Sequence, residues 1–160
     1  MDDEECFYKS VRDLKPDFVI HTAFPFIEDV QIDQPECETK IKKYIKSTRL
    51  LARAAARADV RKIVMTGAAT SIVGKEPKLQ GIYDNSNEWV EDKDEARPNE
   101  KAKLGAERAC WDEILKHQAE IGSSATRLTT ILPYFISGPP LYKEAFNSSC
   151  RAISSIIDGS

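Results

Sequence analysis

The sequence predicts an α/β fold in which a parallel sheet is flanked by helices. Residues 17–22 and 63–66 are the short apolar runs of buried strands, the first buried on both faces, and residues 125–132 form a third strand. Between these runs, apolar residues recur at helical spacing. Because strands that alternate with helices join through right-handed crossovers, we expect a parallel sheet with any ligand outside the carboxyl ends of its strands.

The first half of the chain is predicted to form helix 3–14, strand 17–22, helix 36–58 and strand 63–66. The first helix should stop at Lys15-Pro16, and Pro35 suits the first turn of the second helix. The apolar stripe of that second helix should pack against the sheet. It consists of Cys37, Ile41, Tyr44, Ile45, Leu51 and Ala55.

The second half begins with a long irregular stretch, residues 67–99, of the kind that often forms the rim of an active site. A helix over residues 99–121 follows, and Gly122 should terminate it. After the strand at 125–132, residues 133–141 break regular structure and a final helix is predicted over 142–157.

The composition indicates one globular domain. The chain has 160 residues, of which 41% are hydrophobic and 31% are charged, so it is long enough to bury a core. A net charge of −3 gives no reason to expect nucleic acid or an anionic membrane as a partner. We interpret the basic residues of the 40–61 region as the solvated face of a helix.

The four cysteines, Cys6, Cys37, Cys110 and Cys150, have no CxxC or metal-like spacing. We therefore expect no metal site, and reduced, buried thiols in a cytoplasmic protein. The acidic start of the chain lacks the layout of a signal peptide. No apolar run approaches the roughly 20 residues that a membrane-spanning helix needs.

The start of the 99–121 helix carries a pair of residues that could serve chemistry. Asn99 and Lys103 are four residues apart, so they project from the same face of the helix, one turn from each other. A lysine that points into a cleft can lower the pKa of a phenol one turn before it. The residue at that place is Asn99, which cannot donate a proton to chemistry, and capping the helix N-terminus is its alternative role.

Five segments, residues 18–25, 60–66, 84–89, 103–111 and 133–141, occur in the order of one known family. They resemble the extended short-chain dehydrogenase/reductases of the NAD-dependent epimerase/dehydratase superfamily, specifically the dihydroflavonol-reductase and cinnamoyl-CoA-reductase-like branch. The resemblance covers essentially the whole chain. It implies a partial Rossmann-type, doubly wound parallel sheet with strands equivalent to strands 4–6, and an NAD(P)H-dependent oxidoreductase acting on a ketone, an aldehyde or a secondary alcohol.

In that family a Tyr is the general acid or base, a Lys lowers its pKa and holds the nicotinamide ribose, and a Ser polarises the substrate oxygen. The resemblance places the Lys at Lys103, the Tyr at Asn99 and the Ser at Ala68. Other hydroxyls are displaced from the expected places or more often serve packing; they belong to Thr66, Thr70, Ser71, Tyr83 and Tyr134. We therefore predict a catalytically degenerate homologue.

The resemblance also implies the residues that line the cofactor, which would be NADP(H) or NAD(H). They are Thr22, Ala23, Phe24, Thr66, Lys103, Pro133, Phe135, Ile136 and Ser149. His21 resembles a histidine that follows the fourth strand of the family. For His21 we expect a buried, hydrogen-bonded side chain rather than a general base.

The glycine-rich loop of the family, GxGxxG or GxxGxxG, does not occur in the 160 residues. Such a loop lets the backbone approach the pyrophosphate at a helix N-terminus. Compared with the family, the chain matches a middle portion without the N-terminal glycine-loop half and the C-terminal substrate part. We therefore expect weak or absent cofactor binding, and the small-molecule carbonyl or alcohol substrate rests on the resemblance alone.

The strand at 17–22 should keep an unpaired edge, because its neighbour in the strand order 3-2-1-4-5-6 would be strand 1. An open hydrophobic edge favours pairing with another chain or aggregation. We expect poor solubility or a homo-oligomer that covers this edge. Two alternatives to a degenerate reductase follow: a non-enzymatic interaction module that pairs through the edge, or a fragment of a longer active reductase.

Overall fold

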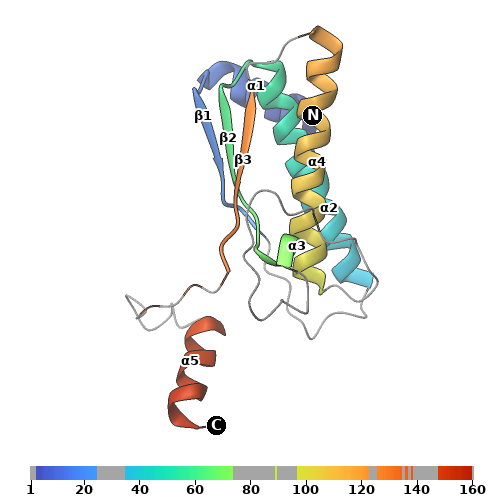
Figure 1. Ribbon diagram of the computed structural model, residues 1–160. Coiled ribbons are helices and arrows are strands. Elements are labelled where there is room, and N and C mark those ends of the chain that lie inside the picture. Colours follow the sequence, from blue (N-terminus) through green and yellow to red (C-terminus); the bar gives the residue numbers. More distant parts are fainter. Residues whose placement is uncertain are drawn as a thin grey trace.

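The computed structural model describes residues 3–24, 35–73, 89, 97–122, 126–134, 136, 138 and 148–159. Its elements, in chain order, are α1 (Asp3–Leu14), β1 (Phe18–His21), α2 (Pro35–Arg57), β2 (Lys62–Thr66), α3 (Thr70–Val73), α4 (Pro98–Ile121), β3 (Arg127–Ile131) and α5 (Ser148–Asp158). Figure 1 shows the sheet on one side of a layer formed by α1, α2 and α4, with α5 apart from both. The predicted alternation of strands and helices is confirmed.

The three strands form one parallel sheet in the order β1-β2-β3. The register aligns Val19 with Ile63 and Leu128, and the side chains of these three residues point toward the helices. The chain moves across the sheet in the same direction at both crossovers, from β1 to β2 through α2 and from β2 to β3 through α4. Right-handed crossovers in one direction place both helices on the same face, which is the arrangement in Figure 1.

The prediction that the first strand is buried on both faces is wrong. Phe18 is 52% exposed and Ile20 is 72% exposed, whereas Val19 and His21 between them are half-buried. The reason is the shared direction of the crossovers, because α1, α2 and α4 cover one face and leave the outward side chains of β1 uncovered among the described residues. A continuous apolar run shows that both faces of a strand are apolar. It does not show that other elements cover both faces.

The core forms where α2 and α4 pack against each other and against β2. The alanines at the end of α2 are almost fully buried, and so are Ala102 and Ala106 in the first half of α4, so small side chains let the two helices pack closely. Gly105 permits this close approach, since a Cβ there would lie 2.5 Å from Cδ1 of Ile45. Of the predicted stripe, Cys37, Tyr44 and Ala55 are core residues, and Ile41, Ile45 and Leu51 pack against the core.

Two helix ends follow the predicted signals. Lys15 has a positive φ of 45°, and its N–H donates to the carbonyl of Val11 (2.9 Å), so α1 ends just before Pro16. Gly122 has a φ of 74°, and its N–H donates to the carbonyl of Gln118 (3.0 Å), which terminates α4 as expected.

The start of α4 differs from the prediction, because Asn99 is not its N-cap. Arg97 precedes the helix with extended backbone, and Pro98 occupies the first helical turn, where a missing N–H costs nothing. The backbone N–H of Arg97 donates to the carboxylate of Glu100 (3.0 Å). The proline and the glutamate therefore define the helix start, and Asn99 lies within the first turn.

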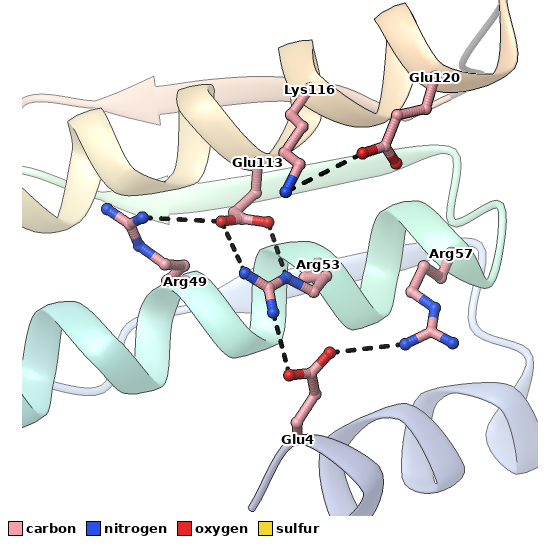
Figure 2. A network of polar contacts seen from close by, with 7 residues as sticks. All are labelled: Glu4, Arg49, Arg53, Arg57, Glu113, Lys116 and Glu120. Atoms are coloured by element: carbon pink, nitrogen blue, oxygen red, sulfur yellow. Dashed lines mark hydrogen bonds and ion pairs between the residues drawn. The ribbon is translucent and has the colours of Figure 1, made fainter.

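A network of ion pairs joins the three helices (Figure 2). Arg53 of α2 donates through Nε and Nη2 to the carboxylate of Glu113 on α4 (2.8 and 3.0 Å), and through Nη1 to Glu4 on α1 (3.0 Å). Arg49 and Arg57 add longer contacts of 3.8 and 3.5 Å to Glu113 and Glu4. The basic side of α2 is thus partly internal to the helix layer, and its interpretation as a purely solvated face is wrong for Arg53.

Candidate functional site

Lys103 projects from α4 to the carboxyl ends of β1 and β2. Its Nζ donates to the backbone carbonyl of Thr66, the last residue of β2 (3.0 Å), and lies 4.2 Å from the ring centroid of Phe24, just after β1. A helical lysine that only faced solvent would make neither contact. The structure therefore brings together three of the residues predicted to line a cofactor, at the edge of the sheet where ligands bind in parallel α/β folds.

Phe24 belongs to a cluster of ring side chains. Tyr44 of α2 meets the Phe24 ring edge-on, with 5.0 Å between centroids, and lies 6.0 Å from the ring of His21. His21 Nε2 and Thr48 Oγ1 are joined by a hydrogen bond of 3.0 Å. This arrangement agrees with the prediction of a hydrogen-bonded, structural histidine, although His21 is half-buried rather than fully buried.

Burial dominates the electrostatics of this cluster. It lowers the pKa of the Lys103 ammonium from its usual value, because the low-dielectric surroundings disfavour the charged form. It also lowers the pKa of His21, and the nearby Lys103 charge acts in the same direction. Burial raises the pKa of the Tyr44 phenol, with a hydrogen bond to Thr48 opposing it. His21 is therefore neutral near pH 7, and Tyr44 keeps its proton.

The turn after β2 holds the position matched to the family's serine. The carbonyl of Ala68 accepts hydrogen bonds from the hydroxyl and the backbone N–H of Ser71 (2.7 and 3.0 Å). The Ser71 hydroxyl is thus used within the turn that starts α3. Gly67 has no room for a side chain, because a Cβ there would lie 2.7 Å from Thr130 Cγ2 and from Leu132 Cδ2. Gly67 therefore cannot carry a serine side chain in the present backbone, and Ala68 is half-buried.

The remaining predicted residues divide into three groups. Pro133 lies next to the turn after β2, because its carbonyl accepts a hydrogen bond from the N–H of Ala69 (3.1 Å). Thr22 and Ala23 are exposed between β1 and Phe24, and Ile136 is 70% exposed. Phe135, Tyr83 and the side chain of Ser149 lie outside the described residues, and the helix that carries Ser149 stands apart from the sheet in Figure 1. Tyr134 is 71% exposed.

A cavity of about 860 Å³ opens beside this cluster, between α1, α2 and the end of β1. Phe7, Phe24, Tyr44 and Leu50 form its apolar walls, together with Ala23. His21 and Ser47 add polar atoms, and Lys40, Lys43 and Lys46 line it from α2. None of its described lining residues is acidic.

Glu107 is a buried group whose environment the sequence did not reveal. It lies one turn after Lys103 on α4, is 5% exposed, and its Oε2 has no hydrogen-bond partner. Burial raises the pKa of its carboxyl group, and the nearby Thr130 hydroxyl and Trp89 indole act in the opposite direction. The repeat of acidic and basic residues along α4 gives no signal for this, because the periodicity does not distinguish a solvated glutamate from one that faces β3.

In the described part of the chain the four cysteines form no disulfide; Cys37 and Cys110 are buried, Cys150 is half-buried and Cys6 is exposed. The expectation of burial is therefore wrong for Cys6. Burial raises the pKa of Cys110 to about 12, so that thiol is unreactive. Among the described residues no group of His, Cys, Asp and Glu side chains could hold a metal ion. The described helices include none that is long and apolar enough to cross a membrane.

No model of a protein family matches the sequence, and no curated protein matches it. Solved structures do match. Yeast methylglyoxal/isovaleraldehyde reductase Gre2, complexed with NADPH, is 19% identical with a TM-score of 0.61, and the match covers 97% of this chain and 47% of that one. MoeE5, in complex with UDP-glucose and NAD, is also 19% identical with a TM-score of 0.60 over 100% of this chain and 46% of that one.

A third similar structure is the UDP-glucose 4-epimerase of Thermus thermophilus in complex with NAD, which is 16% identical with a TM-score of 0.56. That match covers 81% of this chain and 37% of the epimerase. The chain thus spans less than half the length of each of these structures. At such low identity the likeness concerns the fold alone, and it shows that this chain has a parallel, Rossmann-type α/β architecture.

Proposed function

We propose that the chain is a relative of the NAD(P)-dependent extended short-chain dehydrogenase/reductases that retains the nicotinamide side of the cofactor pocket without its catalytic acid. The observation that carries the proposal is the position of Lys103. Its ammonium group reaches the carboxyl ends of two neighbouring strands, against Thr66 and Phe24. The fold shared with three enzymes whose structures contain NAD or NADPH supports the same class of cofactor.

The residues present fit the ribose end of such a cofactor. A lysine ammonium has three N–H donors, and the Thr66 carbonyl accepts from Lys103, so further donors are available for ribose hydroxyls. When bound, a nicotinamide cofactor supplies or accepts a hydride. The phosphate end lacks a matching glycine loop in the sequence, and binding through the ribose end alone should be weak.

The proton-handling part of the parent chemistry is lost in this proposal. The position one turn before Lys103 holds the amide of Asn99, and the position matched to the serine holds the methyl group of Ala68. An amide does not act as a general acid, and a methyl group cannot polarise a carbonyl oxygen. The dihydroflavonol-reductase-like branch remains our proposal for the parent activity, which would reduce a ketone or an aldehyde.

Binding of the cofactor can be measured directly. We expect no saturable quenching of tryptophan fluorescence by micromolar NADPH. We expect nicotinamide mononucleotide at millimolar concentration to shift the amide resonances around Thr66 and Phe24. In Lys103→Met, which keeps an apolar side chain of similar length, these shifts should disappear. Lys116→Met is the matched control, because Lys116 is 64% exposed and lies near the other end of α4. Micromolar binding, or shifts that persist in Lys103→Met, would contradict the proposal.

Restoring the phenol alone should not restore turnover. In Asn99→Tyr the new hydroxyl would lie one turn from Lys103, but Ala68 would still offer no hydroxyl to the substrate oxygen. The measurement is oxidation of NADPH at 340 nm with a panel of small ketones and aldehydes, with Asn99→Phe as the control for ring packing. Turnover by Asn99→Tyr above that control would refute the assignment of two separate losses.

A second candidate function is an interaction module, and the exposed edge of the sheet favours it. In the described part of the chain, β1 pairs only with β2, and its other edge has no strand partner. Phe18 and Ile20 add exposed apolar surface next to that edge. An exposed hydrophobic edge strand is a template for pairing with another chain.

A further inference from the structure

Lys103 has no negatively charged partner in the part of the chain that the structure describes. Its Nζ donates to the Thr66 carbonyl (3.0 Å) and lies 4.2 Å from the centroid of the Phe24 ring, and neither contact involves a carboxylate. The ion pairs between described residues use other basic side chains. A half-buried ammonium group of this kind loses hydration without gaining an ion pair, which disfavours its charged form.

The acidic residues of α4 that are nearest to Lys103 in the sequence do not supply the missing charge. Glu100 accepts a hydrogen bond from a backbone N–H at the helix start (3.0 Å). Glu107, one turn after Lys103, is buried, with its Oε2 3.5 Å from the position that a Cβ would take on Gly67, and burial favours its neutral form. One turn before Lys103, the helix carries the uncharged amide of Asn99.

The described titratable groups on β1 and α2 do not balance the ammonium charge either. Burial and the charge of Lys103 both lower the pKa of His21, so its imidazole is neutral near pH 7. Burial raises the pKa of the Tyr44 phenol, which keeps its proton. The Phe24 ring attracts the ammonium, but a ring has no net charge and offsets only part of the cost of burial. Burial accordingly lowers the pKa of the Lys103 amine, so a larger share of it is uncharged than in a solvated lysine.

An uncharged lysine amine is a nucleophile, and removal from water in apolar surroundings is one way in which proteins activate it. Lys103 also lies where a ligand would bind, because its Nζ is at the carboxyl ends of β1 and β2, the edge at which parallel α/β folds bind ligands. An uncharged carbonyl compound suits these surroundings, since a free amine attacks it and no further charge has to be buried. Among such compounds an aldehyde is the least hindered, which matters at a half-buried nitrogen.

We infer that Lys103 is a reactive lysine that captures small uncharged aldehydes as imines at the strand ends, an activity beyond the proposed cofactor contact. The lone pair of Nζ attacks the carbonyl carbon, a C–N bond forms, and the carbonyl oxygen gains a proton while the nitrogen loses one. The carbinolamine then loses its hydroxyl group and the remaining hydrogen of the nitrogen as water, which leaves a C=N bond. The step is a condensation, so it needs no oxidant, reductant or cofactor, and water reverses it.

The test is reductive labelling of the whole chain at pH 7 with propionaldehyde and sodium cyanoborohydride, which reduces each imine to a stable propylamine. Peptide mass spectrometry gives the rate of labelling at every lysine. Lys43 is the internal reference, because it is exposed and forms no ion pair with a described residue. Half-burial alone would make Lys103 slower than Lys43. We expect Lys103 instead to be labelled about fivefold faster, because its amine is activated.

Asn99→Asp tests whether the missing counter-ion activates the amine. A carboxylate one turn before Lys103 would pair with the ammonium and hold its proton, so labelling of Lys103 should slow about fivefold. The first turn of a helix favours an acidic residue, so this variant should fold. Gln118→Glu makes the same change from amide to carboxylate near the other end of α4 and should alter the rate at Lys103 by less than about twofold. Circular dichroism checks that both variants are folded.

Labelling of Lys103 at or below the rate of Lys43 would overturn the inference. An Asn99→Asp variant that is labelled as fast as the wild type would also overturn it, and so would equal slowing in Gln118→Glu. The response to nicotinamide mononucleotide tests the cofactor site separately. Slow labelling with that response intact would refute the reactive amine alone, and fast labelling without that response would refute the cofactor site alone.

Discussion

Replacing Arg53 with alanine is expected to lower the free energy of unfolding by about 2–3 kcal/mol, between the small cost at an exposed ion pair and the larger cost at a fully buried one, because the Arg53 side chain is 32% exposed. Arg53 holds both carboxylate oxygens of Glu113, and the Glu113 side chain is only 6% exposed. Without the guanidinium, a charge in the α2–α4 interface loses its bidentate partner, and Glu4 of α1 loses its hydrogen bond as well. The measurement is urea unfolding followed by tryptophan fluorescence and circular dichroism.

Arg49→Ala is the matched control for this prediction. Arg49 meets the same carboxylate at 3.8 Å, but its side chain is 44% exposed, so its loss should cost less than about 1 kcal/mol. The double variant Arg53→Met/Glu113→Leu should recover most of the lost stability, because two apolar side chains leave no buried charge without a partner. If Arg53→Ala and Arg49→Ala destabilise the protein equally, the bidentate pair does not contribute as described.

The pH dependence of this pair has a definite sign. Its hydrogen bonds with Arg53 are the main cause that lowers the pKa of Glu113 below its usual value, with the charges of Arg53, Arg49 and Lys116 adding to the shift. The folded state therefore binds this proton less readily than the unfolded state does. Stability from the pair is present above the unfolded pKa and is lost as the pH falls through the lower folded pKa. Arg53→Ala should flatten this acid limb of the stability profile.

Glu107→Gln is expected to raise the free energy of unfolding by about 1–3 kcal/mol at pH 8, because a neutral amide replaces a carboxylate whose charged form is costly to bury. Glu107 is 5% exposed and its Oε2 lacks a hydrogen-bond partner, so ionisation is disfavoured by burial even though Thr130 and Trp89 oppose that shift of its pKa. Glutamine has nearly the same shape and no charge to bury. The measurement is urea unfolding at pH 4 and at pH 8.

The sign is opposite to that of Glu113. Burial raises the pKa of Glu107, so the folded state keeps this proton to a higher pH than the unfolded state does. Its contribution to stability is fully present below the unfolded pKa and is lost as the pH rises through the folded pKa. Glu107→Gln should therefore match the wild type near pH 4 and exceed it at pH 8. Glu113→Gln, the matched change on the same helix, should instead destabilise the protein at pH 8. Equal effects of Glu107→Gln at both pH values would contradict this account.

The position of Lys103 can be explained by local periodicity and topology, and its role toward a cofactor stays a prediction. Lys103 reaches the strand ends because a residue on the inner face of α4, one turn into the helix, lies beside the carboxyl ends of the strands that α4 crosses. The contact with Phe24 could not be predicted in this way. It depends on the packing of the chain after β1 against Tyr44, which looked like an ordinary core residue of the α2 stripe.

The sequence by itself determined the order of the strands and of the long helices, and the parallel sheet. These follow from apolar spacing and from the handedness of crossovers, which act over a few residues or over the whole topology. Only the tertiary structure decided that one face of β1 stays uncovered among the described residues and that Arg53 forms hydrogen bonds with Glu113. It also decided that one carboxylate oxygen of Glu107 has no hydrogen-bond partner. A glutamate has the same local sequence signal in either environment. Its surroundings depend on how closely α4 approaches α2 and β3, and that distance is set by side chains far away in the sequence, such as the contact of Gly105 with Ile45.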